Sequence, residues 1–372
     1  MVVAATHASG LAAAPELAVA AGFTYEALAH RVVFGDGTRE RVADEADRLG
    51  IRRALVLTTP AQQADGEQLG RMLAHRFAAI FPEAAMHTPV GVTERAMRLI
   101  ETSDIDCLVA LGGGSAIGLA KALSLRSGLP QLVLPTTYAG SEMTPILGET
   151  RDGIKSTQRS SNLVPDTVIY DVDLTLSLPS AMSASSGLNA MAHAVEALYA
   201  PEANPIIAMM AERGIAALAS ALPRIVAART DRDARREALL GAWLCGTCLG
   251  TTSMGLHHAL CHILGGTFDL PHAETHAIIL PHAVAYNACA APQAMQAIAR
   301  ALGAQDASPG LFALLHRLEL PTALADIGMP EGGIAHAAAL AARSTYANPR
   351  RLERPALEAL IARAFRGDAP MQ

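Results

Sequence analysis

Short apolar runs alternate with amphipathic stretches of helical length between Arg53 and Thr150. One amphipathic stretch extends to Phe81, and others cover 90–103 and 116–125. The apolar runs are ALVLT at 54–58, AAMH at 84–87, DCLVALGGGS at 106–115 and QLVLPTT at 131–137. Parallel strands need a crossover between them, usually a helix, so this alternation predicts a parallel, doubly wound sheet. The first half of the chain is therefore predicted to be an α/β domain.

The pattern changes after Pro179 to long apolar segments with helical periodicity. These segments lie at 180–200, 205–222, 235–249 and 256–266. A chain of 372 residues is too long for one compact core. We predict an N-terminal extension at 1–22, an α/β domain at 23–180 and an all-α domain at 181–372.

The charge balance excludes nucleic acid as a partner, because the net charge is -6 and no Lys/Arg run occurs. No Lys or Arg precedes Arg31, so the charged start of a secretory signal is missing. The uncharged stretch 238–268 contains six glycines and three histidines, which favours a buried helix pair over a membrane span. The five cysteines, Cys245 and Cys248 among them, are interpreted as reduced thiols in a cytoplasmic protein.

Two polar loops follow neighbouring predicted strands. The first contains Gly112, Gly113, Gly114 and Ser115 and precedes a helix, so its backbone can approach a phosphate. It lacks the G-x-G-x-x-G spacing, and a glycine triplet is also typical of an ordinary tight turn. The second loop, LPTTYAGSEMTP at 134–145, offers short donors at the same sheet edge. Its candidate binding residues are Thr136, Thr137 and Ser141.

Histidines recur at helical spacing in the second half. Asn189 and His193 are four residues apart, as are His258 and His262, and His272 follows after a predicted turn. Such spacing can present converging ligands from two helices, although single buried histidines are more often hydrogen-bonded core residues. His257, His276 and His282 are left without an assigned role.

Five segments resemble the iron-containing alcohol dehydrogenase superfamily and, within it, the maleylacetate reductases. In order along the chain they are VVFGDGTRERV, LGGGSAIGLAKA, LPTTYAGSEMT, GLNAMAHAVEALYA and GLHHALCHILGGTFDLPHAETHAIILPHAVAYN. The resemblance covers about Phe23 to Tyr346. It implies the dehydroquinate synthase-like fold, with a Rossmann-like domain, a helical catalytic domain and a cleft between them.

The resemblance also implies where NADH or NADPH binds. Gly112, Gly113, Gly114 and Ser115 would meet the pyrophosphate, and Thr136, Thr137 and Ser141 would line the path to the nicotinamide. Many relatives carry an Asp after the first strand of the domain to bind the adenosine ribose, whereas this chain has Thr59 in that segment. Without a carboxylate to repel a 2′-phosphate, discrimination between the two cofactors is expected to be weak.

In metal-dependent relatives one Asp and three His hold Fe²⁺ or Zn²⁺, at positions that match Asn189, His193, His258 and His272. We call these four residues the family-type cluster. Its Asn189 is neutral, so no metal is expected, although three imidazoles can still bind zinc.

The resemblance implies reduction of maleylacetate to 3-oxoadipate in aromatic catabolism. Hydride would add to the conjugated C=C bond, and imidazoles would replace the metal in holding and protonating the enolate. We assign His193, His258 and His272 to the substrate and His262 to a relay. Asn189, Lys155 and Arg350 are candidate binding residues for the dicarboxylate, although either cation is equally typical of a surface position.

Two alternatives remain at this point: a metal-dependent alcohol or hydroxyacid dehydrogenase of the same superfamily, and a non-catalytic binding protein on this fold. The resemblance further implies a homodimer.

Overall fold

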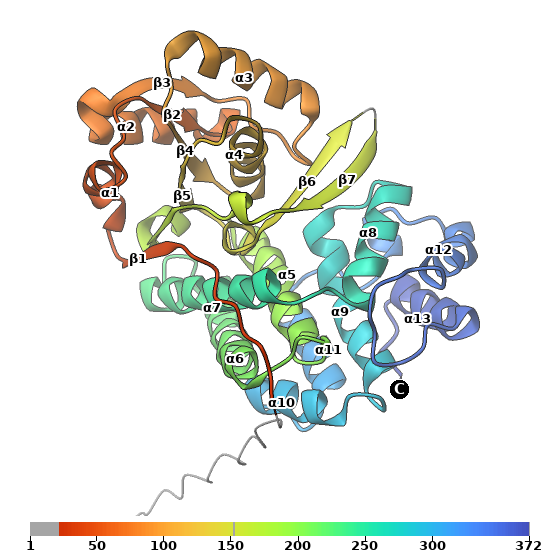
Figure 1. Cartoon of the computed structure of the whole chain (residues 1–372). Helices are drawn as coiled ribbons and strands as arrows, with labels where there is room; N and C mark the ends of the chain where they lie inside the picture. Colours follow the sequence, from red (N-terminus) through yellow and green to blue (C-terminus); the bar gives the residue numbers. More distant parts are fainter. Residues whose placement is uncertain (1–21, 152, 372) are drawn as a thin grey trace, which may run out of the picture.

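The computed structural model describes residues 22–151 and 153–371, and its first half is built around a six-stranded sheet (Figure 1). The strand order is β1-β8-β5-β4-β2-β3, and all neighbouring pairs are parallel. The strands are β1 (Arg31–Gly35), β2 (Ala54–Leu57), β3 (Phe77–Phe81), β4 (Cys107–Gly112), β5 (Gln131–Pro135) and β8 (Thr167–Asp171). The prediction of an α/β first half is confirmed. The predicted N-terminal extension lies outside the described residues except for Gly22.

Helices cover both faces of this sheet, because successive side chains of a strand point to opposite sides. In β2, Leu55 and Leu57 pack with α3 and α4, whereas Val56 packs with α1 and α2. The covering helices are α1 (Val42–Arg48), α2 (Gln63–Leu73), α3 (Val90–Ser103) and α4 (Gly114–Ser127). The sheet is therefore buried on both sides, as its continuous apolar runs require.

The structure differs from the prediction around β3. The predicted helix to Phe81 is wrong in its last part, because α2 ends at Leu73 and 77–81 form a strand. Ala74 has a φ of 54°, which an α-helix cannot accommodate. The run 84–87, predicted as a strand, is a loop. Strand β2 has β4 on one edge, and β3 occupies its other edge.

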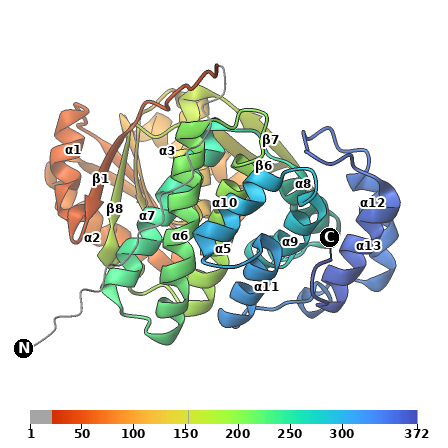
Figure 2. The same cartoon turned by 90° about the horizontal axis from the view of Figure 1, so that it is seen from below.

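The second half is helical, as predicted. Its helices are α5 (Ser180–Ala197), α6 (Pro205–Ala227), α7 (Arg232–Thr251), α8 (Leu256–Phe268), α9 (His272–Asn287), α10 (Pro292–Leu302), α11 (Ala307–Arg317), α12 (Ile334–Ala341) and α13 (Arg354–Arg366). Figure 2 shows α5, α6 and α7 packed side by side. One face of α9 joins the core around these helices through Leu280, and its other face joins a second core with α8, α12 and α13 through Ile279.

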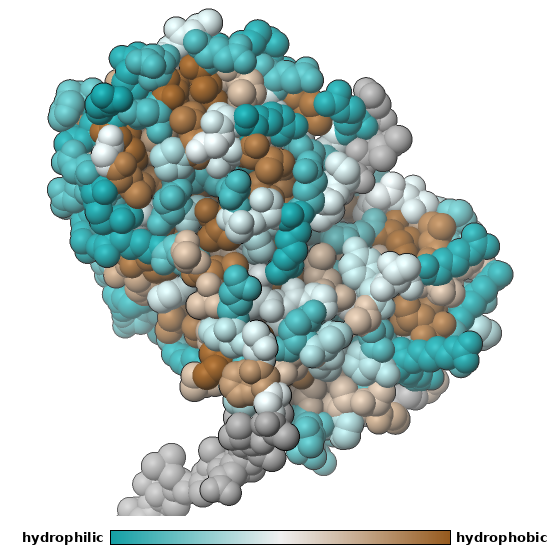
Figure 3. All heavy atoms as spheres, viewed as in Figure 1, coloured by the Kyte–Doolittle hydropathy of each residue, from teal (hydrophilic) through white to brown (hydrophobic). Residues whose placement is uncertain are grey.

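One described helix, α6, is long and apolar enough to cross a membrane. Helices α7 and α8 together are also long and apolar enough, but they are bent by 95° at the break between them. In the structure α6 packs against α5, α7 and α10. On the face shown in Figure 3, apolar side chains form separate patches among hydrophilic residues. The core helix of a folded domain has this same length and composition.

The carboxyl edge of the sheet faces the helical half. There β4 turns into α4, and β5 leads into an antiparallel hairpin of β6 (Ile146–Arg151) and β7 (Ile154–Arg159), which reaches toward α8 (Figure 1). The residues before β1 lie on the helical half, because Leu28 lies against Gly250 of α7 and Tyr25 packs on the helical core.

Candidate active site

A cavity of about 640 Å³ lies where the carboxyl edge of the sheet meets the helices. The turns after β4 and β5 form one wall, and α5, α8 and α9 form the other. Among its lining are the predicted site residues Gly114, Ser115, Thr137, Ser141, Asn189, His193, His258, His262 and His272. The structure thus brings both polar loops and the family-type cluster to one cavity.

The turn between β4 and α4 is shaped by its glycines. Gly112 has a φ of +152°, and a Cβ added there would lie 2.9 Å from that of Ala116. A Cβ added to Gly113 would lie 2.7 Å from the Thr137 side chain. At Gly114 an added Cβ meets no atom within 4 Å, so the first turn of α4 is open. Free N–H groups at such a helix start bind phosphate, and the turn therefore fits a pyrophosphate.

A second cavity of about 310 Å³ lies at the same strand ends and is lined by Thr136, Gln62, Arg39 and Asp65. Thr59 reaches it indirectly, because its hydroxyl donates to Gln62 Oε1 at 3.3 Å and Gln62 Nε2 donates to Thr136 Oγ1 at 3.1 Å. No sequence motif points to Arg39 or Asp65. The local sequence shows only that the two side chains have opposite charges and follow β1 and β2, which does not indicate a shared cavity.

The histidine rings converge from three helices. The rings of His193 on α5 and His258 on α8 stack with centroids 5.2 Å apart, and those of His258 and His262 lie 6.3 Å apart. Burial, and then the neighbouring imidazoles, hold the pKa of His193 well below its usual range. His193 is therefore a neutral hydrogen-bond donor or acceptor near pH 7.

A buried carboxylate that the sequence analysis does not predict, Glu196 of α5, orients one of these rings. His258 Nδ1 lies 2.6 Å from Glu196 Oε2, and the backbone N–H groups of Gly255 and His257 donate to the same carboxylate at 2.8 and 2.7 Å. Burial by itself raises the pKa of Glu196, but these contacts outweigh it and lower the pKa to about 2. The ionised carboxylate fixes the Nδ1–H tautomer of His258. Its Nε2, which has no protein partner among the described residues, is then free for substrate.

Tyr346, in the loop before α13, is also close to the cluster, because its hydroxyl lies 3.4 Å from His262 Nδ1. The sequence analysis gives it no role, since it is 84 residues from that histidine and its contact depends on tertiary structure.

One of the two predicted cationic anchors, Arg350, does not line the cavity. The Arg350 guanidinium donates to the Tyr286 carbonyl at 3.1 Å and lies 4.3 Å above that ring, away from the cavity wall. Lys155 lies on β7, where its backbone pairs with that of Thr150. The described lining does include Lys121, whose Nζ donates to backbone carbonyls of the loop after β5.

The donor set of the family-type cluster contains no anionic ligand for a divalent transition metal. Asn189 supplies a neutral amide, whose buried Oδ1 has no hydrogen-bond partner among the described residues. His258 bonds Glu196 through Nδ1 and keeps Nε2 unpartnered among the described residues, so the missing charge at Asn189 is what disfavours a metal. Within the described ranges, one group of three His, Cys, Asp or Glu ligands has all its donor atoms within 4.8 Å of one another, and it lies elsewhere: His257, Cys261 and His276.

A glycine-lined helix start at the carboxyl edge of a parallel sheet, opening on a cavity with buried imidazoles, is typical of a dinucleotide-dependent enzyme. Two family models match, iron-containing alcohol dehydrogenase over residues 29–172 and the C-terminal domain of that family over 183–365. The chain belongs to the iron-containing alcohol dehydrogenase family.

Its similar relatives include maleylacetate reductases from Burkholderia cepacia and Sphingobium indicum. They are 53% and 52% identical to this chain over 94% of it and 99% of each relative. The crystal structure of maleylacetate reductase from Agrobacterium tumefaciens is 51% identical, with a TM-score of 0.91 over 94% of this chain and 99% of that one.

Proposed function

We propose that this protein is an NAD(P)H-dependent maleylacetate reductase that converts maleylacetate to 3-oxoadipate in the catabolism of aromatic compounds. The observation that carries the proposal is about 50% identity over nearly the whole chain to enzymes of that name. The cavity supports it, because a site for a dinucleotide and a group of hydrogen-bond donors meet there. We further propose that the enzyme acts in the cytoplasm as a homodimer.

The wall formed by the sheet edge is proposed to hold the cofactor. Gly114 and Ser115 at the start of α4 would bind the pyrophosphate, and Thr137 and Ser141 would line the path toward the nicotinamide. When bound, the nicotinamide supplies hydride to the substrate C=C bond. The second cavity, at Thr136 and the side chains beside it, would receive the adenosine ribose.

The helical wall is proposed to hold the substrate and to supply a proton. Hydride addition to the conjugated bond leaves an enolate, which His258 would stabilise from Nε2 while Glu196 balances positive charge on the ring. His193 would donate a second hydrogen bond as a neutral ring. His262, with Tyr346 at its other side, would deliver a proton from solvent.

Recognition of the dicarboxylate is proposed to involve the start of α9 rather than Arg350. His272 begins α9, and the first residues of this 16-residue helix line the cavity, so its N-terminal N–H groups face the space. We propose that His272 and these groups bind one carboxylate. Asn189 would donate its amide N–H to the substrate and take the place of a metal ligand.

The proposal is tested by two measurements on the purified protein. A fluorescence titration with NADH should show saturable binding, whereas a non-catalytic protein on this fold has no need of such a site. Addition of freshly prepared maleylacetate should then oxidise NADH with equal amounts of 3-oxoadipate formed. Binding without any turnover of maleylacetate would reject the assigned substrate.

Glu196→Gln should lower kcat for maleylacetate by about 10²-fold, because an amide can neither stabilise a charged His258 nor fix its tautomer with certainty. The pH dependence of kcat should also change, because a buried carboxylate in contact with His258 is removed. The matched control is Glu202→Gln, which removes a carboxylate that bonds Ser253 outside the cavity wall. A lower Tm with an unchanged pH profile would assign Glu196 a purely structural role.

The charges at the second cavity should set cofactor preference. NADH and NADPH should both serve, within about a hundredfold of each other in kcat/KM. Arg39→Gln should lower the relative efficiency with NADPH, and Asp65→Asn should raise it, each by roughly tenfold, because a 2′-phosphate is attracted by the cation and repelled by the anion. If neither ratio changes, the ribose is bound elsewhere.

A further inference from the structure

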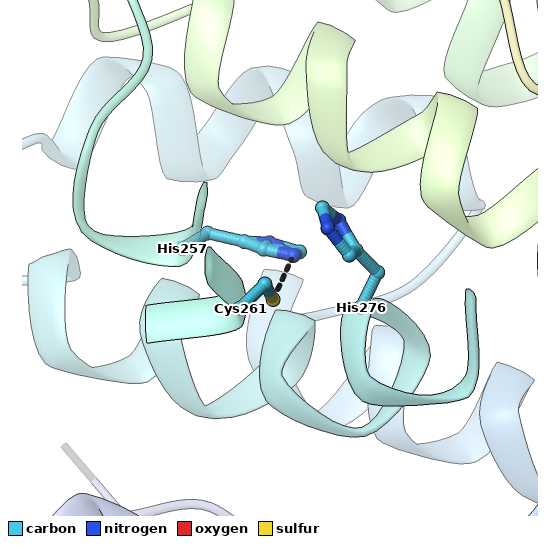
Figure 4. Close-up of side chains that lie close together, drawn as sticks. All are labelled: His257, Cys261 and His276. Carbon is cyan, nitrogen blue, oxygen red and sulfur yellow. Dashed lines mark hydrogen bonds between the residues drawn. The ribbon is translucent and has the colours of Figure 1, made fainter. Parts of the chain in front are cut away.

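Three buried side chains behind the cavity wall form a cluster that the proposed reaction does not use. His257 and Cys261 lie four residues apart on α8, and His276 faces them from α9 (Figure 4). Their exposed fractions are 0%, 1% and 1%. Cys261 Sγ lies 3.4 Å from His257 Nε2, and donor atoms of the three residues all lie within 4.8 Å of one another. We call these residues the thiol–imidazole triad.

Several ring nitrogens of the triad have no hydrogen-bond partner among the described residues, so their lone pairs are available to a cation. Neither ring nitrogen of His276, and not Nδ1 of His257, has a hydrogen-bond partner among the described residues. Both rings lie in the interior, where no water-exposed surface offers them a partner. An unpaired polar atom in an interior is costly, and bonding to a cation removes this cost.

We propose that the thiol–imidazole triad binds one thiophilic divalent cation, for which Zn²⁺ is the representative, at a site separate from the family-type cluster. One thiolate and two imidazoles are ligands that Zn²⁺ prefers, and three protein ligands leave a fourth position for water. The Cys261 proton leaves for solvent on binding. Ligand atoms around Zn²⁺ are about 3.5 Å apart, so the side chains need to close by roughly 1 Å.

The position of the triad gives a cation access from the large cavity and places it close to His258. His276 lines the large cavity, which opens the site to solvent. The His258 ring lies 5.1 Å from the rings of both His257 and His276. A dication at the triad therefore disfavours a positive charge on His258. Since the proposed reaction uses that charge, occupancy should inhibit reversibly.

Binding is tested with Co²⁺, because a cobalt–thiolate bond gives a charge-transfer absorption band that imidazole ligands do not give. We expect one Co²⁺ per chain with this band, displaced by Zn²⁺, and an affinity at least 100-fold weaker in Cys261→Ser. Cys245→Ser is the matched control, because Cys245 is equally buried but lies on α7. Cobalt bound without the thiolate band, or a band unchanged in Cys261→Ser, would overturn the proposal. Should that variant not fold, His276→Asn provides the same comparison.

The inhibitory effect rests on the proposed function and is measured separately. Excess Zn²⁺ should lower the maleylacetate-dependent rate at least tenfold, and a chelator should restore it. In Cys261→Ser the same Zn²⁺ concentration should leave that variant's rate unchanged. Equal inhibition of both proteins would locate the inhibitory cation outside the triad and contradict this assignment. The cobalt titration requires no turnover, so its result on metal binding holds even if the enzyme acts on another substrate.

Discussion

His258→Gln should lower kcat for maleylacetate by about 10²–10⁴-fold, the loss expected when a charge-stabilising proton donor is removed. His258 is singled out by its contact with the ionised Glu196 at 2.6 Å and by its place in the cavity wall. Gln keeps a hydrogen-bond donor of similar size but cannot carry a charge. Because the glycine turn at the start of α4 is untouched, the NADH affinity should change little.

The control for this loss is His282→Gln. His282 is also buried, but it lies on α9 and outside the cavity lining. Its rate should stay within about threefold of the unaltered enzyme, since transition-state contacts are kept. Stopped-flow measurement of kcat and a Tm for each variant separate chemistry from folding. A His258→Gln enzyme that retains more than a tenth of the rate would show that another group holds the enolate.

Asn189→Asp should raise the affinity for Zn²⁺ or Fe²⁺ by at least about 10³-fold, because it adds the missing anionic ligand to three imidazoles. Asn189 is buried, lines the cavity with the three histidines and has no hydrogen-bond partner for its Oδ1 within the described part of the chain. Asp is nearly isosteric with Asn, and the bound cation compensates the new charge. The variant should therefore fold, and its activity should become sensitive to metal.

This substitution is best measured in the Cys261→Ser background, because the thiol–imidazole triad would otherwise bind zinc in parent and variant alike. Equilibrium dialysis then reports only the new site. A folded Asn189→Asp protein that binds zinc no better than its parent would mean that the four residues of the family-type cluster do not converge on one ion.

The sequence predicts those features that depend on local pattern. The alternation of apolar runs and helical stretches predicts β2, β4 and β5, and the glycine turn before α4 follows from spacing alone. Helical spacing also brings Asn189 and the histidines to one wall. Strands β1 and β8 are not predicted from pattern, because each is a five-residue run far from its partner in sequence.

The errors at the site concern side chains whose role depends on tertiary contacts. Glu196 is recognisable only once α8 places His258 beside it. Arg350 has the right charge for a dicarboxylate, but Tyr286 holds it away from the cavity. Arg39 and Asp65 meet at one cavity although the sequence separates them by a helix and a strand.

We propose that this member of the iron-containing alcohol dehydrogenase family reduces maleylacetate without a metal at the family-type cluster. The most direct measurement is NADH oxidation by maleylacetate after exhaustive treatment with chelator, with Fe and Zn content determined on the same sample. We expect an unchanged rate at metal contents far below one ion per chain. A rate that disappears with the metal and returns only with Fe²⁺ or Zn²⁺ would contradict the account.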